Sequence, residues 1–522
     1  SLTIVFVLLA SCGQPSAQAP AVEQPAQATE AAVEPTQPPQ GGELTFSLAT
    51  DQILLDPILT TYNVDIIVHN NIYRQLYRVN EDATGLEPFA AESYEVNDTA
   101  TIWTFKLRDD IKFSDGTPIT AEDVVYSIER GFREDSLQSW VYEEAGLAPG
   151  KTTALDERTV QFELAYTFVP FLSYISGFWA SIFPKAAMEA MGDEEFFKKP
   201  ICSGEWMVEE FVQADHLTIV PNPYAVGEAK LEKVTIPMIV DDNTRMLQLQ
   251  TGQIDVGYTV PASQIAAVDE LPDISVVDYP FAYTAVLYDN QTKAPLDDAN
   301  FRRALNYAID REALIDAVMF GHATFPTSCL PKGVIYWDES IEGFPFDLDK
   351  AKEYLAQSKY ADGFSFELWT SSASATGIET ATALQGMWNQ LPGVTVEVVQ
   401  FEPAVLREKT TNKEHTMYIG GFSSDVADPA EIAAWFITGY INDTRRGGNV
   451  EEVKPLLAAA NGELDPVKRE EIFHEIQQWT QDNAFCFNLY YTANSWGLND
   501  RVKDLWVNPL LIMDLNKVWI QE

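Results

Sequence analysis

The chain of 522 residues carries 78 Asp and Glu residues against 34 Lys and Arg residues, which gives a formal net charge of −44. This excess of negative charge disfavours nucleic acid and anionic ligands, so we predict no nucleic-acid partner. Such a charge is typical of a well-solvated extracytoplasmic surface, and the alternative is a charge suited to a cationic ligand. The chain is long enough to form several lobes, and its 46% of hydrophobic residues is typical of a globular protein.

The N-terminal segment has the pattern of an export signal. An apolar run from Thr3 to Ala10 is too short to cross a bilayer and leads into Leu-Ala-Ser-Cys, which ends at Cys12. We expect residues 1–12 to be a lipoprotein signal peptide, truncated at its start, with a lipobox whose Cys12 carries the lipid anchor. The alternative is the end of a core strand with a chance cysteine.

Residues 13–42 are rich in Gln, Pro, Ala and Glu and contain no aromatic or basic residue. A segment of this composition buries too little apolar surface to offset the entropy of ordering, so we predict a disordered tether. Together with the lipid on Cys12, the tether predicts attachment to a membrane. The expected location is the outer face of the cytoplasmic membrane or the periplasm.

The stretch from Ile102 to Arg133 holds the densest set of local signals. Apolar and polar residues alternate over 102–107 and again at 111–113, and the turn residues of 114–118 follow, which together predict a hairpin. Thr120 and Asp123 form the pattern of a capping box, and apolar residues then recur at helical spacing. We therefore predict that the hairpin leads into a helix.

The run WTFKLRDDIKFSDGTPITAEDVVYSIER resembles the signature of the peptide/nickel solute-binding proteins of ATP-driven importers, family 5, of the oligopeptide- and dipeptide-binding lipoprotein type. The resemblance implies an α/β fold with two lobes, of the periplasmic-binding-protein type II, cluster C, with an extra subdomain in the first lobe. It also implies an ABC permease and ATPase as partners, and a monomer. The expected boundaries are 43–76 with 200–283 and 496–522 for the core of lobe I, 77–199 for the extra subdomain, and 284–495 for lobe II.

No arrangement of side chains in the sequence points to catalysis. His474-Glu475 begins like a zinc-protease helix but lacks the second His, and the serines at 423–424 lack the glycine that a nucleophile elbow requires. Carboxylates are abundant, but no sequence rule places two of them at the separation of a glycoside hydrolase. We predict a binding protein without metal or cofactor, and a secreted hydrolase is the less favoured alternative.

One wall of the binding site is expected at Gly421, Phe422, Ser423 and Asp425, which follow a predicted strand. In peptide-binding members of the family this run supplies an edge strand whose backbone pairs with an extended ligand. The resemblance implies that Asp425 neutralises the α-ammonium group of the peptide. The alternative is that Asp425 only caps the helix near Pro429.

The opposing wall is expected at Thr60, Thr61, Tyr62 and Asn63, where the family places the other side of the same cleft. Pairing through the backbone reads the length and direction of a peptide rather than its side chains. The arginines that family members use for the ligand carboxylate are missing at Ile419, at Thr410 and in 371–376. With 12 Trp and 21 Tyr residues available for stacking, an oligosaccharide is the alternative ligand.

Three cysteines follow Cys12, and an exported protein can pair two of them. Because the family places both segments near its hinge, we predict a disulfide between Cys202 and Cys329, which leaves Cys486 as a buried thiol. The alternative is that the cysteines stay reduced.

Overall fold

The computed structural model describes residues 41–60 and 62–521. Cys12, the lipobox and the predicted tether up to residue 40 lie outside the described residues, as does Thr61. Gly41 and Gly42 belong to the folded part instead of the tether, because the Gly41 amide donates to the Lys230 carbonyl and the Glu232 amide donates to the Gly42 carbonyl. Within 41–60 and 62–521, no helix has the length and apolar character needed to cross a membrane.

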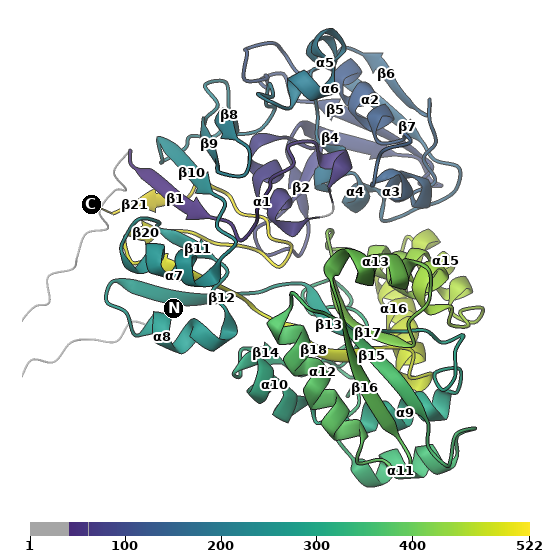
Figure 1. The fold of residues 1–522 in the computed structure, drawn as a ribbon. Coiled ribbons are helices and arrows are strands. Elements are labelled where there is room, and N and C mark those ends of the chain that lie inside the picture. The colour runs from purple at the N-terminus through teal and green to yellow at the C-terminus, as the bar shows by residue number, and fades with distance from the viewer. Residues whose placement is uncertain (1–40, 61, 522) are drawn as a thin grey trace, which may run out of the picture. The chain divides into compact units, whose positions relative to one another are not determined.

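The first lobe is built on a seven-stranded sheet in the order β12-β19-β11-β1-β10-β9-β8 (Figure 1). Its strands come from both ends of the chain and from the middle, and β1 pairs in parallel with both β10 and β11. The strands are β1 (Glu43–Ser47), β8 (Trp206–Val212), β9 (His216–Pro221), β10 (Lys233–Pro237), β11 (Val256–Tyr258), β12 (Ile274–Tyr279) and β19 (Asn494–Asn499).

A separate four-stranded antiparallel sheet lies in the segment between β1 and β8, in the order β4-β5-β7-β6. Its strands are β4 (Ala91–Val96), β5 (Ile102–Leu107), β6 (Thr152–Asp156) and β7 (Thr159–Glu163). Two small sheets complete the upper part of Figure 1: β2 (Tyr77–Val79) with β3 (Leu86–Pro88), and β20 (Val502–Lys503) with β21 (Trp519–Ile520).

The prediction for 102–133 is half right. The capping box exists, because the Asp123 carboxylate accepts from the Thr120 amide at 2.9 Å, and the helix α2 (Ala121–Arg130) begins there. The predicted hairpin forms only in part: β5 pairs with β4 and β7 and no full strand forms at 111–113, but an isolated antiparallel bridge between Lys112 and Pro118 closes the predicted turn. Phe113 is instead buried in the hydrophobic core, so its apolar character reflects packing and not a strand.

The second lobe is built on a six-stranded sheet in the order β14-β18-β13-β17-β15-β16. The chain passes between the two large sheets twice, from β12 to β13 and from β18 to β19, as a hinged two-lobed fold requires. The strands are β13 (Tyr283–Asp289), β14 (Ala323–Thr324), β15 (Ser365–Ser371), β16 (Thr395–Phe401), β17 (Met417–Ser423) and β18 (Phe487–Thr492).

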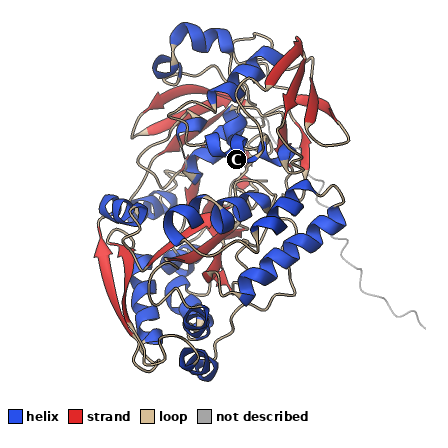
Figure 2. Cartoon of the chain, turned by 90° about the vertical axis from the view of Figure 1, so that its right-hand side faces the viewer, coloured by secondary structure: helices blue, strands red, loops and turns tan. Residues whose placement is uncertain are grey.

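Helices and strands are interleaved throughout the described chain (Figure 2), which is the α/β fold that the sequence predicts. The helices of the first lobe and its insertion are α1 (Asn63–Ile72), α3 (Ser139–Glu144), α4 (Phe171–Tyr174), α5 (Lys185–Met191), α6 (Asp193–Phe196), α7 (Asp242–Gln250) and α8 (Ile265–Asp269). Those of the second lobe are α9 (Ala299–Tyr307), α10 (Arg311–Met319), α11 (Leu348–Ala356), α12 (Ala375–Trp388), α13 (Pro403–Thr411), α14 (Ala430–Ile432), α15 (Lys454–Gly462) and α16 (Pro466–Asp482).

Short turns of other helix types complete the fold. Single 3₁₀ turns are η1 (Pro57–Leu59), η2 (Phe178–Ala180) and η3 (Ala262–Gln264), and two π-helical segments are η4 (Ala433–Thr438) and η5 (Asn442–Arg446). One hydrophobic cluster contains buried side chains from both the four-stranded sheet and the second lobe, including Trp103 and Phe436. A backbone hydrogen bond from Val169 to Asn461 also joins these two parts at 2.8 Å.

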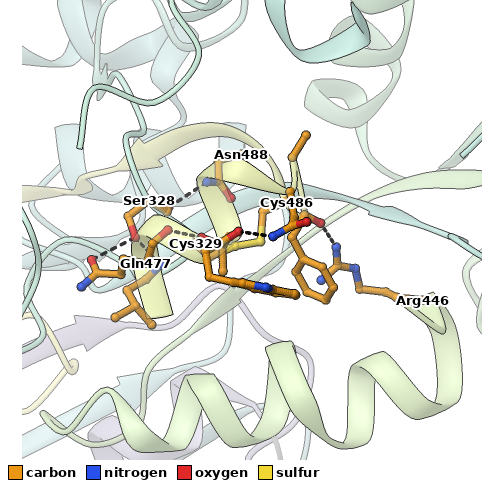
Figure 3. Close-up of a disulfide and its surroundings, with 12 residues drawn as sticks. Ser328, Cys329, Arg446, Gln477, Cys486 and Asn488 are labelled. Carbon is orange, nitrogen blue, oxygen red and sulfur yellow. Dashed lines mark hydrogen bonds between the residues drawn. A yellow bond between two sulfur atoms is a disulfide. The ribbon is translucent and has the colours of Figure 1, made fainter. Parts of the chain in front are cut away.

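The disulfide joins Cys329 to Cys486, with 6.0 Å between the two Cα atoms (Figure 3). Hydrogen bonds place the two segments next to each other, because Asn488 donates to the Ser328 carbonyl at 2.7 Å and the Ser328 amide donates to the Tyr491 hydroxyl at 2.9 Å. The Arg446 guanidinium binds the Phe485 carbonyl from the other side. The bridge thus ties the loop after β14 to the start of β18.

The predicted pairing of Cys202 with Cys329 is therefore wrong. Cys202 is fully buried in the core of the first lobe, together with Phe196 and Trp206, and is a free thiol. Burial raises the pKa of its thiol to about 12, so the group stays neutral and acts as a small apolar side chain. The fold buries both Cys202 and Cys486, and the sequence pattern alone does not show which of them pairs with Cys329.

We expect non-reducing peptide mapping to recover Cys329 linked to Cys486, with Cys202 alkylated only after unfolding. The sequence separation is 157 residues, so replacing Cys486 by Ala should lower the free energy of unfolding by up to about 5 kcal/mol in the chain-entropy model. The double variant Cys329→Ala with Cys486→Ala controls for the unpaired thiol of the single variant. A linked peptide that contains Cys202 would contradict the assignment.

Candidate functional site

Strand β17 has one paired edge and one edge that becomes open along its length. On one side every residue from Met417 to Ser423 pairs with β13. On the other side β15 pairs only with Met417 and Tyr418. Residues 419–423 therefore have no strand partner on that edge within the described chain. An open edge of this kind can add a further extended segment through backbone hydrogen bonds.

Two adjacent glycines on β17 leave room for tyrosine rings on opposite faces of the strand. A Cβ atom at Gly420 would lie 2.5 Å from a ring carbon of Tyr288, and one at Gly421 would overlap the hydroxyl of Tyr283. The Tyr288 hydroxyl donates to the Gly421 carbonyl at 2.9 Å. The close approach of the rings thus requires glycine at both positions. Because these residues have no side chains, nothing from them covers the open edge of the strand.

The turn after β17 is fixed by a buried ion pair. Asp428 and Arg469 are each 3% exposed, and the guanidinium donates to both carboxylate oxygens at 2.7 and 2.8 Å. The same carboxylate accepts from the Ala430 amide at 2.9 Å and so caps α14. The capping role that the sequence left open for Asp425 belongs to Asp428.

Asp425 is left without a partner for its carboxyl group. No hydrogen bond or ion pair involves its carboxylate oxygens within the described residues, although its backbone amide donates to Glu431 at 3.0 Å. Glu431 lies in α14, is 4% exposed, and also accepts from the Ser424 hydroxyl at 2.9 Å and from the Val426 amide at 3.4 Å, all through Oε2. Two neighbouring acidic groups thus share one turn.

Burial raises the pKa of both groups. The pKa of Asp425 is raised to about 7 by loss of hydration. The pKa of Glu431 is raised to about 8, first by burial and then by the charge of Asp425, against the opposing effect of its three hydrogen-bond donors. Carboxyl groups in this state favour a nearby cation, because a positive charge would offset both the lost hydration and the mutual repulsion.

The first lobe supplies the opposite wall through the loop before α1. The Asp65 carboxylate accepts from the Leu54 amide at 3.2 Å and from the Thr60 hydroxyl at 2.5 Å, which fixes the course of this loop. The Thr60 carbonyl already accepts from the buried Gln138 amide at 2.6 Å. Further along, the Ser423 hydroxyl donates to the side chain of Asn63 at 3.3 Å and links the two walls.

These walls enclose a cavity of about 660 Å³. Its lining comes from the first lobe, from the inserted segment and from the second lobe, and no Lys, Arg or His side chain contributes to it within the described residues. The lining residues are Ala49, Thr50, Asp51, Tyr62, Asn63, Val64 and Val240, then Gln138 and Trp140, and then Tyr283, Gly421, Phe422, Ser423, Asp425, Glu431, Ile432 and Trp435.

Six of the predicted site residues meet at this cavity: Tyr62, Asn63, Gly421, Phe422, Ser423 and Asp425. Thr60 does not line it, because its side chain and carbonyl are bound to Asp65 and Gln138, and Thr61 lies outside the described residues. Sequence reasoning missed Glu431, Trp140 and Trp435. Glu431 follows Asp425 by six residues, and its acidic side chain in an otherwise apolar run was the available signal.

Comparison with known proteins agrees with this architecture. The model of the bacterial extracellular solute-binding proteins, family 5, middle region, matches residues 85–443. A probable D,D-dipeptide-binding periplasmic protein of Escherichia coli, DdpA, is 29% identical over 485 residues, which cover 90% of this chain and 92% of the relative. Heme-binding protein A of Haemophilus influenzae is 25% identical, with 86% of each chain covered.

Among solved structures, the periplasmic binding protein DppA of Helicobacter pylori in complex with the peptide STSA superposes with a TM-score of 0.79. The two chains are 24% identical, and the match covers 93% of this chain and 99% of the other. The two-lobed, type II fold that the resemblance implied is therefore confirmed. The protein is a solute-binding protein, and its chain belongs to family 5 of the bacterial extracellular solute-binding proteins.

The glycine pair of β17 gives a test of the local packing. We expect Gly421→Ala to lower the free energy of unfolding by about 1–3 kcal/mol, because the new methyl group displaces the Tyr283 ring. Gly386→Ala in α12 is the matched control, since a Cβ there meets nothing within 4 Å and should raise stability by about 0.5–1 kcal/mol. Chemical denaturation measures both changes, and equal effects would contradict this packing.

The raised pKa values predict how stability depends on pH. Because the folded protein holds protons on Asp425 and Glu431 that the unfolded chain releases near pH 4, its stability should fall as pH rises through about 5 to 8. The free energy of unfolding of the Glu431→Gln variant should fall less steeply with pH, and the difference in slope should reach up to about 1.4 kcal/mol per pH unit in that range. Denaturant titrations of ligand-free protein at pH 5, 6, 7 and 8 measure this difference, and superimposable pH profiles would refute it.

Proposed function

We propose that the protein captures peptides outside the cytoplasmic membrane and delivers them to the permease and ATPase of an ABC importer. The observation that carries this proposal is the position of Asp425, an unpartnered carboxyl group at the end of an open strand edge inside a cavity between two lobes. The peptide-binding relatives add support, because DdpA is described as binding D,D-dipeptides and DppA was solved with a peptide.

In this proposal, the backbone of the peptide pairs with 419–423 of β17, where β15 no longer occupies the edge. Main-chain hydrogen bonds give affinity without selecting side chains, which suits an importer of varied peptides. The α-ammonium group binds Asp425, and Tyr62 and Asn63 close over the ligand from the first lobe. Thr60 supports this wall rather than supplying a direct contact, and Thr61 stays a proposed ligand contact.

The lobes close around the ligand without a covalent step. For this motion we assign 43–76, 200–283 and 496–522 to the core of lobe I, 77–199 to its extra subdomain, and 284–495 to lobe II. The hinge is then formed by the two connections between the large sheets, at 280–282 and at Ala493. The protein acts as a monomer that the lipid on Cys12 holds at the membrane.

An oligosaccharide is the second candidate ligand, because the cavity is lined by Tyr62, Trp140, Phe422 and Trp435. Aromatic rings stack on sugars as well as on peptide side chains. The unpartnered acidic group favours the peptide, since a neutral sugar would not offset its charge. Native mass spectrometry of the purified protein separates the two, because the mass of the retained ligand identifies its class.

We expect Asp425→Asn to weaken binding of a free tripeptide by about 2–5 kcal/mol, because the substitution removes one partner of a buried charge pair. Calorimetry with the tripeptide Ala-Ala-Ala and its N-acetylated form measures this effect in both proteins. In the unaltered protein, acetylation should cause a loss of similar size.

The matched control is Asp316→Asn, an exposed aspartate on α10 that is remote from the cavity lining. This variant should bind the tripeptide as the unaltered protein does. Equal affinity of the free and acetylated peptides in the unaltered protein would overturn the assignment of the ammonium site to Asp425. Turnover of peptides or glycosides, abolished by one carboxylate substitution, would favour a hydrolase instead.

A further inference from the structure

Glu431 presents a second acidic group to the same cavity. All three of its hydrogen bonds use Oε2, and Oε1 has no partner within the described residues. The side chain is 4% exposed and yet lines the cavity, and Oε1 is the oxygen that its own hydrogen bonds leave open. The acidic groups of Asp425 and Glu431 are therefore both available to one bound molecule.

The cavity offers no positive charge to balance this pair. Asp51 adds a third carboxylate at the rim, and the lining contains no basic side chain among the described residues. Asp428, a buried acid in the same turn, is neutralised instead by its bidentate bond to Arg469. A single α-ammonium group would compensate only one of the two inner carboxyl groups, and the other would have to stay protonated in a closed, dehydrated site, whereas a second cation would allow both to ionise.

The walls near the acidic pair are aromatic and suit an amine. Trp435 and Phe422 lie on the second lobe with Glu431, and Trp140 lines the same cavity from the inserted segment. Indole and phenyl faces attract ammonium groups and pack well against the methylene stem of a long basic side chain. Carboxylates combined with aromatic walls are the arrangement that organic cations require.

We propose that this cavity selects ligands with a second positive charge close to the α-ammonium group, namely peptides whose first residue has a basic side chain. The inference rests on the proposed peptide-binding function and specifies its ligand class. Asp425 binds the α-ammonium group, Glu431 binds the side-chain cation through its open oxygen, and the rings of Trp140 and Trp435 enclose the aliphatic stem.

The test is calorimetry at pH 7.5 with three tripeptides that differ only in their first residue: lysine, its neutral near-isostere norleucine, and alanine. The lysine peptide should bind at least about tenfold more tightly than the norleucine peptide, which corresponds to about 1.4 kcal/mol. Equal or tighter binding of the norleucine peptide would overturn the inference. In that case the proposed function stands, because the peptides still bind.

Variants then locate the second cation site. In Glu431→Gln, the amide oxygen can still accept from the turn amides, and the preference for lysine over norleucine should fall to less than about threefold. Glu475→Gln removes an exposed carboxylate of α16 and should keep the full preference. An unchanged preference in Glu431→Gln would overturn the role of Glu431. If none of the three peptides binds the unaltered protein, the proposed function fails as well.

Discussion

The ion pair between Asp428 and Arg469 is the interaction on which the site depends. Both side chains are buried, and their two parallel hydrogen bonds supply the compensation that a charge needs in a medium of low polarity. The pair anchors the turn after β17 to α16, and the capped start of α14 follows from it. Because the turn is held by Asp428, Asp425 need not stabilise it and can keep its carboxyl group free.

The rest of the site follows from keeping one strand edge open. β15 pairs only with the first two residues of β17, Met417 and Tyr418, and then separates from it. β13 pairs with β17 along its whole length. The tyrosine rings over Gly420 and Gly421 then support the strand from both faces without covering its edge. Rigid support combined with an open edge allows a ligand to complete the sheet without first rearranging the protein.

The sequence predicted most of what depends on local pattern. The capping box at Thr120, the mixed α/β layers and the run from Gly421 to Asp425 were all visible as patterns or through a resemblance. What depends on distant partners was not visible. The hairpin is reduced to one bridge between Lys112 and Pro118 because β5 pairs with β4 and β7 instead. The predicted disulfide is wrong because Cys202 and Cys486 are both apolar, buried and alike in sequence. Trp140 and Glu431 reach the cavity only through the tertiary fold.

The large negative charge of the chain acts on two different levels. Of its 78 acidic residues, most of those in the described part of the chain are exposed and screened over about 8 Å at physiological salt, so they affect solubility and the rate at which a cation approaches. The acids inside the cavity are screened less, because burial removes part of their hydration and so raises the pKa of both groups. In the proposed site, affinity for a cationic group would therefore depend on Asp425 and Glu431, whereas the surface charge would contribute mainly to the rate of encounter.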